Sequence, residues 1–426
     1  MKNINVINSI MGSGKSTFFI NKINDEANST AFDSKPDKKF IVITLLLDES
    51  VRYVGACPSA EFRSPRSIKG RKLFGLNHLL QAGENIVTTH QLFKLMDRDT
   101  FDLIKGMGYT LVIDEVLDCV HQYADLTKDD IKLLADEGLT YVDDDNRIRW
   151  AEPKYKGKFE NIMPLCKNGN LIHGEKNIVI WEFPVDFFNL FDEVWIGTYL
   201  WHGSLMRSYL ESHRIDVCLH GVEGGNLIPY SRGNDRQTKE QLKSLITIVD
   251  NKRLNAIGEV PPKVGKGRPR QPLSSGWFDA AASNESKDIK TLKKNLLSFF
   301  SYEAPGPAGD AMWTTLKKMQ SRLAGKGYTR GFVPSNVKAT NEYRHKKRLA
   351  YITNVYLSPI IKNHLNWETT DNFDDLFALS EMLQWIFRSQ IRDGKPITIY
   401  IPSERMRRLL DQWLSNKVNI DMTSLL

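Results

Sequence analysis

Apolar runs and helical periodicities alternate along the first half of the chain. The apolar runs predict strands at residues 4–7, 39–47, 84–90, 110–115, 177–181, 193–200 and 215–219. The helical patterns fall at residues 18–23, 72–80, 92–104 and 204–212. Apolar strands that alternate with helices are typical of a parallel sheet that is covered on both faces. The pattern therefore predicts a doubly wound α/β domain.

The second half of the chain has a weak pattern at its start and a regular one afterwards. Residues 221–290 contain turn-forming glycines and prolines, which predict an irregular, basic linker. Helices are then predicted at residues 287–300, 311–324, 376–392 and 403–414, and strands at 329–333 and 396–401. We therefore expect a first domain at residues 1–220, the linker, and a second α/β domain at residues 291–426. Residues 117–175 of the first domain are expected to be an insertion.

A glycine-rich turn joins the first predicted strand to the first predicted helix. It consists of Gly12, Ser13, Gly14, Lys15, Ser16 and Thr17. In a turn of this kind the backbone N–H groups and the lysine bind phosphates, and the Ser/Thr hydroxyl binds Mg²⁺. The N-terminus of the helix adds the positive end of its dipole. Ser9 replaces the first glycine of the pattern G-x-x-x-x-G-K-[ST], but the positions that contact phosphate are kept.

Two carboxylates, Asp114 and Glu115, end the apolar strand at residues 110–115. Ligands bind at the carboxyl ends of the strands in parallel α/β sheets. We expect Asp114 to hold Mg²⁺ there and Glu115 to polarise the water that attacks the nucleotide. The turn and the carboxylates, about 100 residues apart, together predict a nucleoside triphosphatase.

The net charge of +7 is unevenly distributed over the 426 residues. Residues 1–215 hold 26 Lys and Arg against 30 Asp and Glu, a balance of −4, whereas residues 216–426 hold 32 against 21, a balance of +11. Because Lys and Arg displace counterions from a phosphate backbone, the basic second half predicts nucleic acid as a partner. The basic run at residues 263–270 is equally compatible with a nucleic-acid contact and with a connector.

One predicted helix of the second half carries polar and charged side chains on a single face. Gln384, Arg388 and Arg392 are four residues apart, which would place them on one side of the helix at residues 376–392. The planar fork of an arginine can stabilise the charge on a γ-phosphoryl group during its transfer. The spacing is typical of a sensor for ATP that is bound in a cleft.

The order of these features resembles that of superfamily 2 helicases, in particular the compact helicase-like ATPases of tailed bacteriophages. Residues 9–17 match motif I of that family, and Asp114 with Glu115 matches motif II. Residues 384–392 are similar to motif VI, which carries the arginine finger. The segments similar to the motifs that contact nucleic acid or couple hydrolysis to movement are Thr88-Thr89-His90, Gly197-Thr198-Tyr199 and Ala339-Thr340-Asn341.

The resemblance implies two RecA-like domains that hydrolyse ATP, with Mg²⁺, in the cleft between them. It implies catalytic roles for Lys15, Glu115, Gln384, Arg388 and Arg392, and metal binding by Ser16 and Asp114. It implies nucleic-acid contacts by Thr88, Thr89, His90, Thr340 and Asn341. The function implied is an ATP-dependent helicase or translocase, with DNA favoured over RNA. Which arginine is the finger is left open.

Three other functions remain open. A DNA-packaging ATPase similar to a phage terminase would share the turn and the carboxylates, but residues 216–426 show no convincing acidic nuclease cluster. A small-molecule P-loop kinase would not need the paired arginines. A nucleic-acid-binding or host-interaction factor could use ATP only as a switch.

Cellular location is indicated by features of the whole sequence. No apolar run approaches the roughly 20 residues of a membrane span, and no signal-peptide pattern precedes the first strand. The four cysteines are scattered, which predicts neither a zinc site nor a disulfide framework. We expect a protein of the cytoplasm, which is the host cytoplasm if the gene is carried by a phage. Oligomeric state is open, and a monomer is compatible with the sequence.

Overall fold

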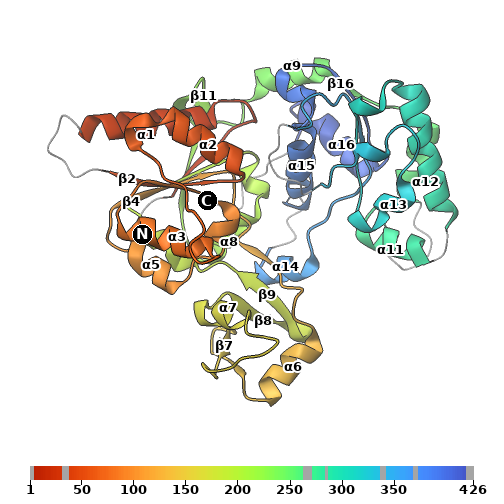
Figure 1. Ribbon diagram of the computed structural model, residues 1–426. Coiled ribbons are helices and arrows are strands. Elements are labelled where there is room, and N and C mark those ends of the chain that lie inside the picture. Colours follow the sequence, from red (N-terminus) through yellow and green to blue (C-terminus); the bar gives the residue numbers. More distant parts are fainter. Residues whose placement is uncertain are drawn as a thin grey trace. The chain divides into compact units, whose positions relative to one another are not determined.

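The computed structural model describes residues 4–30, 38–261, 271–283, 286–335, 342–367 and 373–418. The chain divides into two compact units (Figure 1). Unit 1 comprises Met1–Tyr230 and Ser358–Thr369, and unit 2 comprises Ser231–Leu357 and Thr370–Leu426. The chain therefore passes between the units three times.

A sheet of seven strands forms the centre of the described part of unit 1. In the order in which they lie, the strands are β12 (Asn226–Pro229), β11 (Val217–Glu223), β1 (Ile4–Asn8), β10 (Glu193–Thr198), β4 (Tyr109–Asp114), β2 (Lys39–Thr44) and β3 (Ile86–Thr89). Neighbouring strands pair in parallel, except that β12 forms an antiparallel hairpin with β11. The predicted α/β class with mainly parallel sheets flanked by helices is confirmed.

Helices cover both faces of this sheet (Figure 1). One face carries α1 (Lys15–Thr30) and α2 (Leu47–Ala56), and the other carries α3 (Lys72–Gln81), α5 (Arg98–Ile104) and α8 (Leu205–Ser212), while the short α4 (His90–Phe93) follows β3. Side chains of a strand alternate between the faces, so Phe40 and Val42 of β2 pack in one core with Phe19 of α1. Burial of such apolar surface stabilises the layers by roughly 25 cal/mol per Å².

Two small sheets are inserted between β4 and β10. One contains β5 (Val120–Gln122), β9 (Ile178–Glu182) and β8 (Leu171–Gly174), and the other pairs β6 (Thr140–Val142) with β7 (Ile148–Trp150). The helices of this insertion are α6 (Lys128–Asp136) and α7 (Met163–Asn168). A capping box between Thr127 and Asp130 begins α6. The insertion expected at residues 117–175 thus continues to the end of β9.

Glu182, the last residue of β9, joins separate parts of unit 1. Its carboxylate accepts hydrogen bonds from Arg147 at 3.2 Å and from His364 at 2.7 Å, and it lies 3.3 Å from Nε2 of His213. His364 ends α14 (Pro359–His364), which belongs to the segment of unit 1 that follows most of unit 2. Burial raises the pKa of Glu182, but the hydrogen bonds and charges of the two histidines outweigh burial and lower the pKa to about 2.

Unit 2 has, within its described residues, a parallel sheet of four strands. In spatial order the strands are β13 (Ile246–Ile248), β16 (Ile397–Tyr400), β15 (Arg348–Tyr351) and β14 (Ala311–Thr314). The helices are α9 (Arg236–Leu245), α10 (Lys252–Asn255), α11 (Ser275–Ser283), α12 (Lys287–Ser298), α13 (Gln320–Leu323), α15 (Phe373–Ile386) and α16 (Glu404–Leu414). Across the described ranges of both units, no helix combines the length and the apolar character needed to cross a membrane.

The structure differs from three predictions for the second half. Residues 221–290 are not a linker, because β12 extends the sheet of unit 1 and β13 belongs to the sheet of unit 2. Residues 311–324, predicted as a helix, begin with the fully buried strand β14, since a short apolar run suits either element. Residues 329–333, predicted as a strand, contain the 3₁₀ helix Thr329–Gly331, after which Phe332 forms a single bridge to Trp313.

Substitution of two glycines in helices of unit 1 would show how closely its layers pack. A Cβ atom on Gly75 of α3 would lie 1.9 Å from the carbonyl oxygen of Arg66, whereas a Cβ atom on Gly55 of α2 would meet nothing within 4 Å. Gly55→Ala is expected to raise the free energy of unfolding by about 0.5–1 kcal/mol, because alanine favours the helix. Gly75→Ala is expected to lower it by about 1–3 kcal/mol through overpacking. Urea unfolding measures both values, and equal effects would contradict this packing.

The low pKa of Glu182 predicts a contribution to stability that depends on pH. Its folded pKa of about 2 lies below the usual 4.5, so the charged form stabilises the fold at neutral pH by about 3 kcal/mol. This contribution is complete above pH 4.5 and is lost as the pH falls toward 2. Glu182→Gln should therefore lower the melting temperature strongly at neutral pH and progressively less in acid. The exposed Glu160, changed to Gln, is the control; a deficit for Glu182→Gln that is independent of pH would reject this account.

Candidate nucleotide-binding site

Two glycines give the loop between β1 and α1 its conformation. Gly12 has a φ of +83° and Gly14 a φ of +99°, values that residues with a side chain rarely adopt. A Cβ atom on Gly14 would also lie 2.8 Å from the backbone nitrogen of Gly225, in the β11–β12 hairpin. Glycine is therefore required at position 14 both by its backbone angles and by the closeness of the hairpin.

Ser9 fixes the start of the loop to both neighbours of β1. Its amide donates to the carbonyl oxygen of Thr198 on β10 at 3.0 Å. Its hydroxyl oxygen accepts a hydrogen bond from the amide of Val222 on β11 at 2.9 Å. The glycine that the general pattern places here could not accept this second bond, so the replacement by serine adds a connection between loop and sheet.

Lys15 carries the positive charge of the loop. Its side chain is buried, and Nζ donates to the carbonyl oxygens of Ser9 at 2.7 Å and Ile10 at 3.1 Å. Burial lowers the pKa of Lys15, whereas the negative charges of Glu115 and Asp114 act in the opposite direction. The amine therefore lies inside the loop and within the field of Glu115, predicted to be catalytic, and of Asp114, predicted to bind the metal.

The first turn of α1 adds further hydrogen-bond donors. The first amides of a helix have no acceptor within the helix, so those of Lys15, Ser16 and Thr17 can donate to an anion. The Ser13 hydroxyl oxygen is buried and has no hydrogen-bond partner among the described residues. A phosphate oxygen would satisfy both kinds of donor. The loop therefore fits the phosphates of the nucleotide expected from the sequence.

The register of the sheet places the two carboxylates beside this loop. Ile7 of β1 is level with Gly197 of β10, which is level with Asp114 of β4. A Cβ atom on Gly197 would lie 2.9 Å from the ring of Phe19 and 3.6 Å from Oδ1 of Asp114. Gly197 of β10, which has no side chain, thus lies between β1, which leads into the loop, and Asp114 of β4.

Each carboxylate residue is held by a specific contact. The Tyr53 hydroxyl donates to Asp114 Oδ2 at 2.9 Å, and both residues are buried. Burial, and then the charge of Asp114, raise the pKa of Tyr53 well above its usual value, so the hydroxyl remains a donor. Glu115 has a φ of +103°, which is strained for a residue with a side chain, and its amide donates to the carbonyl oxygen of Gly197 at 3.2 Å.

The donor set also fits the expected Mg²⁺. The Ser16 hydroxyl follows the loop directly, and the Asp114 carboxylate lies at the same edge of the sheet. Mg²⁺ prefers oxygen ligands, usually one or two carboxylates together with phosphate oxygens and water. Ser16 and Asp114 are therefore the residues that would hold the ion.

Thr88, Thr89 and His90 lie at this same edge. Thr89 ends β3, and the pairing of β2 with both β3 and β4 places it level with Asp114. Thr88 and His90 are buried, whereas Thr89 is half-buried. Of the three side chains, that of Thr89 is the most accessible to a ligand.

The residues expected in the second domain are placed only in part. Thr340 and Asn341 lie outside the described residues. Gln384 is half-buried in α15, Arg388 is buried after the end of that helix, and Arg392 is exposed. All three belong to unit 2, whereas the glycine-rich loop and the two carboxylates belong to unit 1.

The predicted common helical face of Gln384, Arg388 and Arg392 is wrong. Helix α15 ends at Ile386, and a 3₁₀ helix follows at Gln390–Asp393. Ser389 causes the break, because its hydroxyl donates to the carbonyl oxygen of Ile386 at 2.7 Å and its backbone is extended. A side chain that bonds to the local backbone competes with helical hydrogen bonds, and a pattern of apolar positions does not show this.

Sequence reasoning missed Tyr53 and Gly225 as parts of the site, and it named Gly197 only within the segment Gly197-Thr198-Tyr199, without its role between β1 and β4. Tyr53 lies in α2 within no motif, and its contact with Asp114 exists only in the folded sheet. Gly225 carries a signal, the pair Gly224-Gly225, but such a pair is equally typical of a domain boundary. Its packing against the loop follows from β11 lying beside β1.

The structure is that of an α/β protein with a glycine-rich loop between the first strand and the first helix of its parallel sheet. Residues 240–414 match the family model described as YonV C-terminal Rossmann-like domain, and residues 120–181 match the YonV middle domain. The SPbeta prophage-derived protein YonV of Bacillus subtilis (strain 168) is 36% identical over 432 residues, which cover 98% of this chain and 100% of that protein. The chain therefore belongs to the YonV family.

Solved structures show only a distant likeness. An apo XPD structure has a TM-score of 0.45 at 11% identity, over 97% of this chain and 95% of that one. For S. tokodaii Xpd4 the TM-score is 0.39 at 10% identity, with 98% and 95% covered. For S. cerevisiae Dbp5 bound to RNA and ADP BeF3 it is 0.34 at 10% identity, with 98% and 84% covered. These likenesses are too low to support an inference about the chain.

The strained backbone at Glu115 predicts an unusual order of stabilities. Both Glu115→Ala and Glu115→Gly remove the carboxylate, but only glycine adopts a φ of +103° without strain. Relief of about 1–3 kcal/mol of strain exceeds the roughly 0.4–1 kcal/mol that glycine loses through its freer unfolded chain. Glu115→Gly should therefore unfold at a higher temperature than Glu115→Ala in differential scanning calorimetry. The reverse order would show that the backbone at this position is not strained.

Proposed function

We propose that the protein is an ATP hydrolase that uses hydrolysis to move along or unwind nucleic acid, with DNA favoured over RNA. The observation that supports hydrolase activity is that the loop with Lys15 and the carboxylates of Asp114 and Glu115 lie at the same edge of the sheet. A single strand, β10, separates β1, which leads into the loop, from β4, which ends at Asp114. Phosphoryl transfer to water requires a phosphate-binding loop, a metal-binding carboxylate and a group that orients the water. Unit 1 supplies a candidate for each of these from its own residues.

The residues of the site have separate tasks in this proposal. Lys15 and the first amides of α1 bind the phosphates of ATP. Mg²⁺, when bound by Ser16 and Asp114, neutralises charge that develops on the phosphates. Tyr53 keeps Asp114 in place through its hydrogen bond to Oδ2. Glu115 orients the attacking water, and its constrained backbone fixes the direction of the carboxylate.

The motor function assigns tasks to both units. Arg388 or Arg392 contacts the γ-phosphate in this proposal, Gln384 has a separate catalytic role, and Thr89 contacts the nucleic-acid backbone. The proposal gives Thr88, His90, Thr340 and Asn341 the same backbone role. Support comes from the second unit being another parallel α/β unit and from the balance of +11 in residues 216–426. A positive surface attracts the phosphates of a nucleic acid.

Glu115→Gln separates binding of ATP from hydrolysis. The amide keeps the size of the side chain but cannot polarise water, so turnover should fall about 100-fold or more. Affinity for ATP, measured by displacement of a fluorescent analogue, should stay within about twofold, since the phosphates contact Lys15 and the loop. The exposed Glu137, changed to Gln, is the matched control and should keep full turnover. Turnover by Glu115→Gln near the parental rate would remove this residue from the mechanism.

ATPase rates with and without single-stranded DNA then distinguish the motor from a switch. Strong stimulation is expected for a motor, because closure on both ligands assembles the site. Absence of stimulation would favour a factor that uses ATP only as a switch. A strand-displacement assay would separate unwinding from translocation.

A further inference from the structure

One segment of unit 2 carries just over half of the positive balance of +11 in residues 216–426. Residues 286–330 contain nine Lys and Arg but only three Asp and Glu, a balance of +6 against +7 for the whole chain. The other 381 residues hold 49 basic and 48 acidic side chains. Such a concentration creates a local potential that attracts polyanions. The segment includes α12, α13 and strand β14.

Helix α12 presents part of this charge as a stripe. Lys287, Lys290 and Lys294 are exposed and recur at intervals of three and four residues, so they lie on one face. The opposite face, with Leu292 and Leu296, is buried in the core of unit 2. Helix α13, which packs against α12 (Figure 1), adds one further exposed basic residue, Arg322. We call the three lysines of α12 the lysine stripe.

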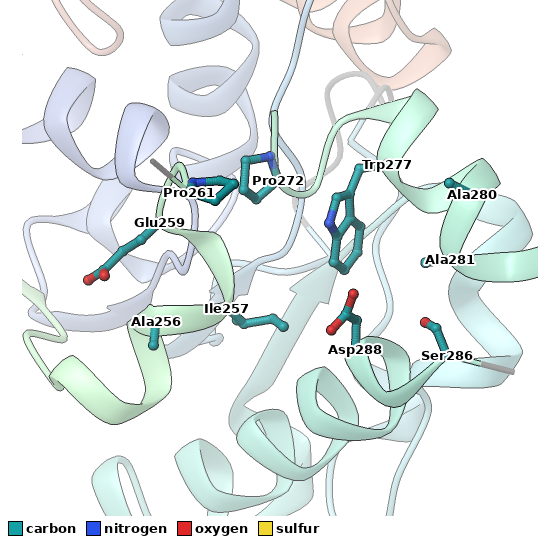
Figure 2. Close-up of a pocket in the computed structure, with 10 residues that line it drawn as sticks. All are labelled: Ala256, Ile257, Glu259, Pro261, Pro272, Trp277, Ala280, Ala281, Ser286 and Asp288. Atoms are coloured by element: carbon teal, nitrogen blue, oxygen red, sulfur yellow. The ribbon is translucent and has the colours of Figure 1, made fainter. Parts of the chain in front are cut away.

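A cavity of about 530 Å³ lies beside the first turn of the same helix (Figure 2). Its lining includes Glu259, Pro261, Pro272, Trp277, Ser286 and Asp288. Figure 2 shows the Asp288 carboxylate pointing toward the Trp277 ring, whereas the Glu259 carboxylate points away from it. The cavity therefore offers an aromatic face and a hydrogen-bond acceptor to one ligand. We call it the Trp277 pocket.

The chemistry of the Trp277 pocket suits a flat ring that carries amino groups. A nucleobase can stack on the indole, and its amino or imino N–H groups can donate to the Asp288 carboxylate. The described residues that line the pocket are neutral or acidic, and the acidic side chains repel a phosphate group. A cationic side chain of a protein would also suit an indole and a carboxylate. The lysine stripe, which begins at the residue next to Asp288, repels such a cation.

We propose that unit 2 binds single-stranded nucleic acid here, with one unstacked base in the Trp277 pocket and neighbouring phosphates on the lysine stripe. The two features select for the two parts of a nucleotide, an aromatic base and an anionic phosphate. A single strand is favoured over a duplex, because a paired base must first leave its stack at a cost of a few kcal/mol. An anionic membrane is disfavoured, because the apolar face of α12 is buried in unit 2. The inference rests on the proposed function, for which it names a binding surface.

The lysine stripe is tested by binding of labelled single-stranded DNA to the full chain, measured by fluorescence anisotropy over a range of salt concentrations. The variant carries Lys287→Gln, Lys290→Gln and Lys294→Gln together. Loss of three phosphate contacts should weaken binding about 10-fold to 100-fold at low salt and reduce the salt slope by roughly 2. The matched control carries Lys154→Gln, Lys156→Gln and Lys158→Gln, three exposed lysines of unit 1 with the same change in charge. It should lose much less affinity.

The Trp277 pocket is tested with a strand of the same length whose central bases are replaced by abasic sites. The parent should bind the abasic strand about 5-fold to 100-fold more weakly than the normal strand. Trp277→Ala should remove this difference, whereas Trp277→Phe, which keeps an aromatic ring, should retain most of it. Thermal unfolding of both variants verifies that unit 2 is folded. If Trp277→Ala is not folded, the comparison of the parent with Trp277→Phe still decides the test.

The outcomes separate this inference from the proposed function. If the parent chain does not bind single-stranded DNA, both fail. If the parent binds but the two lysine triples lose equal affinity, only the surface assigned here is rejected, and the motor proposal stands. Equal binding of normal and abasic strands by the parent rejects the pocket. Binding of a labelled oligolysine peptide that depends on Trp277 would make the pocket a site for a protein instead and overturn the inference.

Discussion

Strand β10 holds the two halves of the candidate nucleotide site together. Two consecutive carbonyl groups do this, since that of Gly197 accepts the amide of Glu115 and that of Thr198 accepts the amide of Ser9. Because Gly197 has no side chain, the ring of Phe19 fits beside it. A Cβ atom on Gly197 would lie 2.9 Å from this ring. A side chain at this position would push α1 away from the sheet and carry the loop with it. The distance between the glycine-rich loop and β4 therefore depends on position 197 being a glycine.

The same arrangement explains how a strained residue persists at the edge of the sheet. A φ of +103° at Glu115 costs about 1–3 kcal/mol. One backbone hydrogen bond to Gly197 returns only about 1 kcal/mol, so the bond alone does not hold the conformation. The remainder comes from strand β4, which precedes Glu115 and all of whose residues are buried. The buried strand before Glu115 therefore helps to hold the strained backbone of this residue in place.

The features that could be predicted from the sequence are those encoded within a few neighbouring residues. The apolar strands, the glycine-rich turn and the acidic end of β4 are local patterns, and together they indicated the α/β class before any coordinates. The contact between Tyr53 and Asp114 is not local, because 61 residues separate them. The buried run at β14 suits a helix or a strand equally, and its parallel pairing with β15 decides the outcome. At Ser389 a single hydroxyl ends a helix that the apolar pattern alone would continue.

A hydrogen bond joins the segment of unit 1 that follows most of unit 2 to the insertion. This segment, Ser358–Thr369, contains α14, whose His364 is hydrogen-bonded to Glu182 at the end of the insertion. Breaking such a bond leaves a buried charge with fewer partners, which costs more than the bond itself contributes. Glu182 therefore joins α14 to β9 within unit 1, and β9 leads through one short segment to β10, where both halves of the site are held.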